Sequence, residues 1–307
     1  MNRDVYDQPL VSVIMNCYNS SKYLREAIDS VLAQTYQNWE IIFWDNASVD
    51  ESPAIVKSYS DPRLKYFKGE MTVPLGHARN LAIEKCMGEY IGFLDCDDIW
   101  LPQKLEKQVP LFADPSVDIV FSDSFFFNNE GAQWRLYKKK KFFTGKCFSE
   151  LLTRYFLSLE TVVIRRSSLS RLSYWFDEKF STIEEADLFR RIAYNGKLDM
   201  VNEVLAKWRV HSGSYTWNKI QDFRSETEQM LEEYDKLYPG FSVSYASEII
   251  QLRARLLVGE AKYYWENGES KKARELIYSY RYPKTLLVYL MLMVSFLPGK
   301  YFNRIKG

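Results

Sequence analysis

Residues Gly88–Asp98 read GEYIGFLDCDD, and this stretch decides the fold prediction. Tyr90–Leu94 is a nearly continuous apolar run, which is typical of a strand buried on both faces of a parallel sheet. Asp95, Asp97 and Asp98 follow at once, and carboxylates this close repel one another unless a cation is present. Hard oxygen ligands in an open turn suit Mg²⁺ or Mn²⁺ holding phosphate groups, whereas the alternative, a helix N-cap, would require only Asp98. The stretch therefore predicts a buried strand that ends in a metal site.

The residues before this stretch alternate between strand and helix patterns. Short apolar runs rich in β-branched residues predict strands, and apolar residues at i, i+3, i+4 and i+7 predict a helix over Leu24–Leu32. The expected strands are Val11–Met15, Glu40–Trp44, Leu64–Phe67 and Tyr90–Leu94, with helices after Asn19, after Asp50 and over Gly76–Met87. This alternation predicts an α/β fold, a mostly parallel but mixed sheet flanked by helices on both faces.

The pattern changes towards the C-terminus. Strand and helix periods are mixed as far as Trp217, and almost everything beyond it repeats with a helical period. The expected elements are strands at Asp118–Phe121 and Thr161–Ile164, an exposed loop at Tyr137–Lys141, a helix at Ile183–Tyr194, and further helices at Gln221–Leu237, Val243–Trp265, Ser270–Tyr280 and Lys284–Phe296. We therefore expect one domain over residues 1–217 and a helical C-terminal appendage over residues 218–307.

Composition excludes several classes of protein. The 307 residues include 41 basic and 40 acidic side chains, for a formal net charge of +1, so we expect no nucleic-acid partner. The four cysteines lack paired spacing, which indicates reduced thiols in a cytoplasmic protein and no zinc finger. The first ten residues are too polar for a signal peptide. The apolar run Leu286–Leu297 is shorter than the ~20 residues that span a bilayer.

Polar residues follow three of the expected strands, at Asn16–Asn19, Asp45–Ser48 and Asp95–Asp98. Ligands of open α/β sheets bind outside the carboxyl ends of the strands. These three stretches are therefore the expected ligand-binding edge.

Four motifs in order, Val11–Asn19 (VSVIMNCYN), Asp45–Asp50 (DNASVD), Gly76–Asn80 (GHARN) and Gly88–Asp98, make the sequence resemble the inverting family 2 glycosyltransferases. The resemblance covers roughly residues 9 to 217. It implies the A-type glycosyltransferase fold, with residues 1–217 as a catalytic domain that binds a nucleotide sugar. It also implies Mn²⁺ or Mg²⁺ and transfer with inversion at the anomeric carbon.

The resemblance also implies roles for single residues. Four residues would contact the base of the donor, one its ribose and one its diphosphate, and two would bind the metal. They are Asn16, Tyr18, Asp45 and Asn46 for the base, Asp95 for the ribose, Arg79 for the diphosphate, and Asp97 and His211 for the metal. Many relatives have an aspartate where this chain has Asn46, and an amide both donates and accepts, so uridine and thymidine donors both remain open.

An inverting displacement needs a base that takes the proton of the acceptor hydroxyl. The family's acidic pair aligns with Glu184 and Glu185, which makes Glu185 the expected general base. Glu184 or Asp187 could be the reacting group instead, and an acidic helix start is the structural alternative. Tyr18 and Trp100 follow strands where a base and a sugar could stack.

The C-terminal residues are markedly basic. From Lys271 to Lys306 there are eight Lys and Arg residues and one acid, Glu275, around the apolar run Leu286–Leu297. An apolar helix flanked by basic residues can lie in a membrane interface, or it can pack on the domain as a core helix. The Lys138–Lys141 run could join the same surface or form a solvated loop.

Together these observations predict an inverting glycosyltransferase on the cytoplasmic side, peripheral to the membrane. Its donor would be a nucleoside diphosphate sugar, with uridine favoured over thymidine, and its acceptor a hydroxyl of a polysaccharide or lipid-linked oligosaccharide. The rival from another class is a non-catalytic nucleotide- or glycan-binding scaffold with the same fold. A nucleotidyltransferase would require a glycine-rich phosphate loop after the first strand, and Asn16–Ser21 contains no glycine.

Overall fold

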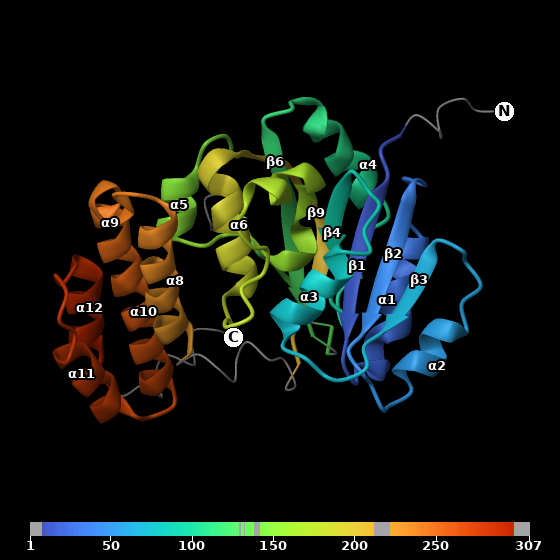
Figure 1. Cartoon of the computed structure of the whole chain (residues 1–307). Coiled ribbons are helices and arrows are strands. Elements are labelled where there is room, and N and C mark those ends of the chain that lie inside the picture. The colour runs from blue at the N-terminus through green and yellow to red at the C-terminus, as the bar shows by residue number, and fades with distance from the viewer. Residues whose placement is uncertain (1–7, 129, 132, 138–141, 212–221, 298–307) are drawn as a thin grey trace. The chain divides into compact units, whose positions relative to one another are not determined.

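The structure is a computed structural model that describes residues 8–128, 130–131, 133–137, 142–211 and 222–297 (Figure 1). The lysines of the Lys138–Lys141 run lie outside the described residues. The chain divides into two compact units, and each is treated by itself. The first contains Met1–Phe148 and Phe156–Gly213, and the second contains Ser149–Tyr155 and Ser214–Gly307.

In its described part the first unit is built on one mixed sheet with the strand order β3-β2-β1-β4-β8-β6-β9-β5, and β7 adds to β6. The strands are β1 (Val11–Cys17), β2 (Trp39–Asp45), β3 (Leu64–Lys68), β4 (Tyr90–Phe93), β5 (Ile99–Trp100), β6 (Val117–Phe127), β7 (Gln133–Arg135), β8 (Val163–Arg165) and β9 (Lys197–Arg209). The first four strands are parallel, β8 is antiparallel to β4 and β6, and β9 is parallel to β6. The predicted mixed, mostly parallel α/β fold is confirmed, and so are its first four strands.

Helices cover this sheet because their apolar spacing matches the helical period. They are α1 (Ser21–Leu32), α2 (Ser52–Lys57), α3 (Leu75–Ile83), α4 (Lys104–Gln108) and α6 (Glu184–Asn195). Leu24, Ala27, Ile28 and Val31 of α1 are buried in the core formed with β1 and β2. Burial of such a stripe is the main source of helix stability in a folded protein.

One long strand, β9, is absent from the sequence prediction. Its residues, KLDMVNEVLAKWR, are half polar and only partly buried, so no clean alternation of apolar and polar residues marks it. It pairs with β6 along nearly its whole length, with shifts in register near Val117 and Asp123. Long-range pairing with β6 therefore decides the conformation of this segment.

The second unit is helical in its described part. Its helices are α5 (Phe148–Thr153), α8 (Asp222–Leu237), α9 (Phe241–Ser244), α10 (Ala246–Glu266), α11 (Ser270–Tyr278) and α12 (Leu286–Val294). A separate core packs residues such as Leu257, Ala261 and Ile277 of α10 and α11 against Val288 of α12. The Ser149–Tyr155 segment groups with these helices, although the sequence pattern places it in the first domain. Among the described residues, no helix combines the length and apolar character needed to cross a bilayer.

Candidate active site

The carboxyl ends of β1, β2 and β4 meet at one edge of the sheet. Cys17 pairs with Asp45 in the parallel register, and the Asn46 N–H donates to the Cys17 carbonyl at 2.8 Å. The Leu94 N–H donates to the Ile14 carbonyl at 3.0 Å, so the chain after β4 leaves the sheet beside the end of β1. Residues that are up to 80 positions apart in the sequence therefore share this edge, as the strand-end rule predicts.

Asp45 fixes the turn after β2. Its Oδ1 accepts a hydrogen bond from the Ser48 N–H at 2.8 Å, and its Oδ2 accepts one from the Tyr66 hydroxyl at 2.5 Å. Ala47 inside this turn has φ 62°, in the left-handed region that side-chain-bearing residues rarely adopt. Asp45 has no exposed surface here, so its direct contact with a base stays a prediction that requires one of these bonds to open.

The other three residues predicted to contact the base differ in hydrogen bonding and exposure. They are Asn46, Asn16 and Tyr18. The Asn46 amide is bound at both ends by the backbone of Val73, at 2.8 and 3.1 Å, and so anchors the loop before α3. The Asn16 Nδ2 is buried and finds no acceptor among the described residues. Tyr18 is exposed, as an aromatic surface for a base would be.

A buried cluster of charge joins α3, the end of β4 and the start of α6. The Arg79 guanidinium lies 2.7 Å from Glu184 Oε1 and 3.5 Å from Asp95 Oδ1. The side chains of Arg79 and Glu184 are almost completely buried, whereas that of Asp95 is partly exposed. Burial raises the pKa of Asp95 to about 6, and the Arg79 charge opposes this shift. Arg79 therefore holds two carboxylates in place at the site.

Glu185 lies beside this cluster, at the first turn of α6. Burial raises the pKa of Glu185 to about 8, the Arg79 charge lowers it, and the neighbouring charges of Glu184 and Asp95 raise it further. A carboxylate whose pKa is close to neutral pH is well matched to accept a proton in a reaction. Glu185 therefore has a pKa suited to proton exchange near neutral pH, and its role as the general base stays a prediction.

A further part of the site joins His211, two residues after the end of β9, to the loop after β4. The His211 Nε2 lies 2.9 Å from Asp97 Oδ2, across 114 positions of the sequence. Arg209 fixes this loop, because its N–H donates to Asp98 Oδ1 at 2.8 Å and its Nε–H donates to the Asp97 carbonyl at 2.9 Å. The helix-cap alternative for Asp98 is wrong, since Asp98 is buried and binds the end of β9 instead.

Asp97 and His211 could supply two of the ligands of a divalent cation, but not a complete ligand set. No group of three or more His, Cys, Asp or Glu side chains suited to a metal occurs within the part of the chain that the structure describes. Mg²⁺ and Mn²⁺ at phosphate-transfer sites commonly take one or two protein ligands and complete their shell with substrate phosphate and water. An oxygen and an imidazole nitrogen 2.9 Å apart, both partly exposed, match that kind of site.

Two predicted site residues have structural positions instead. Trp100 is 1% exposed, donates its indole N–H to the Glu160 carbonyl at 2.9 Å, and packs so closely on Gly92 that a Cβ there would lie 2.7 Å from the ring. Its predicted stacking on a sugar is therefore wrong. Asp187 has no exposed surface and binds Arg191 one turn along α6 at 2.6 Å, so the alternative that it is the reacting group is also wrong.

The sequence pattern assigned no role to Arg209, which fixes the loop that contains Asp97 and Asp98. Its guanidinium lies 4.1 Å from the Tyr23 ring and 4.4 Å from the Phe127 ring, and it pairs with Glu26 of α1 at 2.6 Å. The only signal in the sequence is its place two residues before His211, because the sequence pattern does not predict β9, the strand that Arg209 ends.

Comparison with known proteins agrees with this fold. The profile of Glycosyl transferase family 2 matches residues 12–173, which is more than half of the chain. The chain belongs to this glycosyltransferase family. Over 222 residues it is 30% identical to the Escherichia coli UDP-Glc:alpha-D-GlcNAc-diphosphoundecaprenol beta-1,3-glucosyltransferase WfgD, covering 72% of this chain and 85% of that protein. An uncharacterized glycosyltransferase of Methanocaldococcus jannaschii, MJ1057, is 35% identical over 66% of this chain and 72% of its own length.

Solved structures share the architecture. Staphylococcus aureus TarS 1-349 in complex with UDP-GlcNAc superposes with a TM-score of 0.58 at 20% identity, over 96% of this chain and 91% of that chain. The mannosyltransferase PcManGT from Pyrobaculum calidifontis, in complex with GDP-Man and Mn2+, superposes with a TM-score of 0.64 at 18% identity, over 98% of this chain and 85% of that chain. The expected A-type glycosyltransferase fold with C-terminal helices is therefore confirmed.

Proposed function

We propose that this glycosyltransferase moves a sugar, with inversion, from a uridine diphosphate donor to a hydroxyl of a lipid-linked oligosaccharide or polysaccharide. The observation that carries the proposal is the convergence of Asp95, Asp97, His211 and Glu185 on the carboxyl edge of one sheet. The name of the Escherichia coli relative, a glucosyltransferase that acts on a diphosphoundecaprenol-linked sugar, supports the class of acceptor.

In the proposed reaction the acceptor oxygen attacks the anomeric carbon from the face opposite the diphosphate. The bond from that carbon to the phosphate oxygen breaks, and Glu185 takes the proton of the acceptor hydroxyl. Arg79 keeps Glu185 ionisable by opposing the increase in its pKa, and it orients Asp95 towards the donor. Transfer through one base, without a covalent intermediate, inverts the anomeric configuration.

Asp97 and His211 are the residues that would hold Mn²⁺ or Mg²⁺, together with the diphosphate of the donor. Such a cation, when bound, stabilises the negative charge on the leaving nucleoside diphosphate. Arg209 fixes the position of the Asp97 loop, so both ligands remain in place when donor enters.

Uridine is proposed as the base of the donor because of the environment of Asn16. A buried N–H without an acceptor costs free energy, and a pyrimidine carbonyl beside Asn16 Nδ2 would remove that cost. The E. coli relative is named for UDP-Glc and one structural neighbour is a UDP-GlcNAc complex, whereas another carries GDP-Man. Thymine differs from uracil by one methyl group and is the competing base.

Peripheral association with the cytoplasmic face of the membrane is part of the proposal. The α12 helix is apolar, and Leu286, Met293 and Phe296 in and beside it are 73%, 60% and 62% exposed. The basic residues Lys271 and Lys272 lie on exposed positions of neighbouring α11. Exposed apolar side chains beside basic residues suit the surface of an anionic bilayer, where a lipid-linked acceptor would be found.

The test is a transfer assay with purified full-length protein, Mn²⁺, a panel of UDP-, dTDP- and GDP-sugars, and a polyprenyl-diphosphate-linked sugar as acceptor. We expect turnover with one UDP-sugar and a product of inverted anomeric configuration. Turnover only with another nucleotide would overturn the donor, and a product with retained configuration would overturn the role of Glu185.

A further inference from the structure

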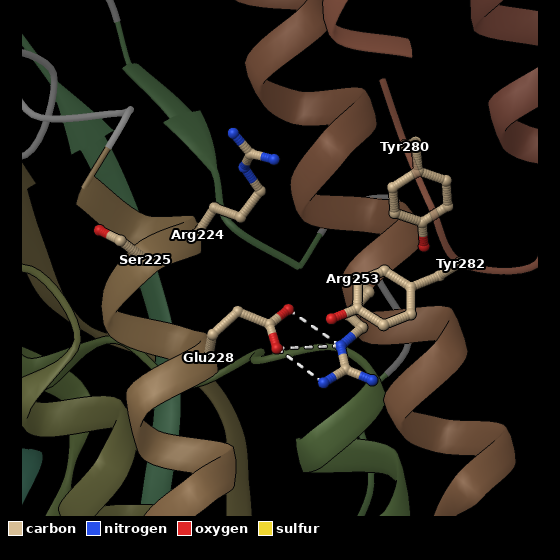
Figure 2. Close-up of a pocket in the computed structure, with 6 residues that line it drawn as sticks. All are labelled: Arg224, Ser225, Glu228, Arg253, Tyr280 and Tyr282. Carbon is tan, nitrogen blue, oxygen red and sulfur yellow. Dashed lines mark hydrogen bonds and ion pairs between the residues drawn. The ribbon is translucent and has the colours of Figure 1, made fainter. Parts of the chain in front are cut away.

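The helical unit contains a cavity that the proposed reaction does not use. It has a volume of about 260 Å³ and lies between α8, α10 and the chain that follows α11 (Figure 2). Figure 2 shows the side chains of α8 on one side of it and two tyrosines on the other. The lining residues are Arg224, Ser225, Glu228, Arg253, Tyr280 and Tyr282.

The charges around the cavity are already paired. Arg253 binds Glu228 through two parallel hydrogen bonds, from Nε to Oε1 at 2.9 Å and from Nη2 to Oε2 at 2.6 Å. Arg224 forms an ion pair with Glu260 at 3.0 Å. Two guanidinium groups are therefore balanced by two carboxylates, and an anion would have to displace one of them. This balance favours an uncharged ligand.

The cavity also holds a hydroxyl that lacks a partner. The Tyr280 Oη is buried and makes no hydrogen bond to any of the described residues. Tyr280 lines the same cavity as the Arg253–Glu228 pair, and burial raises the pKa of its phenol. A neutral ligand with hydroxyl groups would satisfy the Tyr280 O–H and use the free lone pairs of Glu228.

An aromatic surface completes the lining. Tyr282 is 41% exposed, and the Arg253 guanidinium lies 4.1 Å from the centre of its ring. The Tyr280 and Tyr282 rings lie 5.6 Å apart, at 63° to each other. An apolar ring face beside fixed carboxylate, guanidinium and hydroxyl groups is complementary to a sugar, which has an apolar C–H face and hydroxyls at its edge.

We propose that this cavity binds one uncharged sugar ring, separately from the catalytic site. Its volume of about 260 Å³ is below the roughly 300–1,000 Å³ that is typical of pockets for drug-sized ligands, so it suits a single ring. The identity of the occupant as a unit of the acceptor glycan rests on the proposed function, whereas the binding of a sugar does not.

The test is ligand-observed NMR with the full-length protein, in saturating UDP and Mn²⁺ so that the catalytic site is occupied. The probes are methyl glucopyranoside, N-acetylglucosamine and inorganic phosphate. Whichever of the two sugars binds the wild type, Tyr282→Ala should weaken its binding by about fivefold or more, because the aromatic surface is lost. Tyr280→Phe should weaken it by a similar factor through loss of one hydrogen bond, while thermal stability without sugar stays equal or increases.

The matched control is Tyr278→Ala, because Tyr278 at the end of α11 is 60% exposed, precedes Tyr280 by two residues and does not line the cavity. It should leave sugar binding unchanged. Equal sugar binding by the wild type, Tyr280→Phe and Tyr282→Ala would overturn the proposal, and so would binding of phosphate alone. These outcomes differ from failure of the proposed function, which would appear as absent transfer by the wild-type protein in the donor assay.

Discussion

Replacement of Arg79 by methionine should destabilise the protein and change its pH–rate profile. Methionine keeps most of the side-chain length and removes the charge. Arg79 lies 2.7 Å from Glu184, and their side chains are only 4% and 8% exposed. The variant would therefore leave a buried carboxylate without its partner, which is much more costly than the loss of a surface ion pair.

The expected magnitude follows from this burial. Breaking a buried ion pair by removal of one partner costs about 3–5 kcal/mol. A second change, Glu184→Gln, removes the unpaired charge, so the double variant should recover about 2 kcal/mol of that loss. The control is Lys107→Met, because Lys107 and Glu203 pair at 2.5 Å on the surface, with side chains 30% and 56% exposed. That change should cost less than ~1 kcal/mol.

The assay is equilibrium unfolding in urea for the wild type, both single variants, the double variant and the control, with the pH–rate profile of each folded enzyme. Loss of the Arg79 charge removes an influence that lowers the pKa of Glu185, so the rise of activity with pH should move to higher pH. A cost below ~1 kcal/mol for Arg79→Met, or no rescue by Glu184→Gln, would refute the buried pair. An unchanged pH–rate profile would refute the coupling to Glu185.

Three further predictions address the site and the helical unit. Glu185→Gln should retain donor binding in calorimetry but lose transfer by about a hundredfold or more. Because the folded pKa of Glu185 is raised to about 8, the wild type should also lose more stability than the variant as pH rises from about 4.5 to 8. Retained transfer would place the base elsewhere. Asp97→Ala and His211→Ala should each weaken Mn²⁺ binding by about tenfold or more in titrations with donor present, and unchanged affinity would remove that residue from the metal site. Phe296→Asp should reduce the amount of protein that sediments with anionic vesicles. Added salt should reduce the sedimentation of the wild type. Equal binding of the wild type to neutral and anionic vesicles would contradict an electrostatic contribution from the basic residues.

The first half of the fold was predictable because local sequence and final environment agree. Val11–Met15 is apolar except for Ser12, Tyr90–Leu94 is a nearly continuous apolar run, and both are buried on both faces. Leu24–Leu32 has one apolar stripe and buries it. The second half was predicted less completely. β9 is partly exposed and is formed by pairing with β6, which its own residues do not signal.

The sequence predicted which edge of the sheet carries the site, but it did not predict the contacts that each side chain makes there. Strand ends are visible in sequence, so Asp95 and Asp97 were expected there. Whether a side chain faces the ligand or the protein depends on neighbours that are distant in sequence. The Trp100 ring is buried because Gly92 leaves room for it. The Asn46 side chain is hydrogen-bonded to the backbone of Val73. Neither contact has a local signature.

The position of β9 has a direct consequence for catalysis. His211 reaches Asp97 only because β9 ends beside the loop after β4, and Arg209 locks that end to the Asp97 carbonyl and to Asp98. The parallel half of the sheet thus supplies the edge proposed to bind the donor, while the mixed half supplies the second proposed metal ligand. A change that shifted the register of β9 on β6 by one residue would turn the last strand residues to the opposite face. We therefore expect metal binding to depend on the pairing of β6 with β9 as strongly as on the ligands themselves.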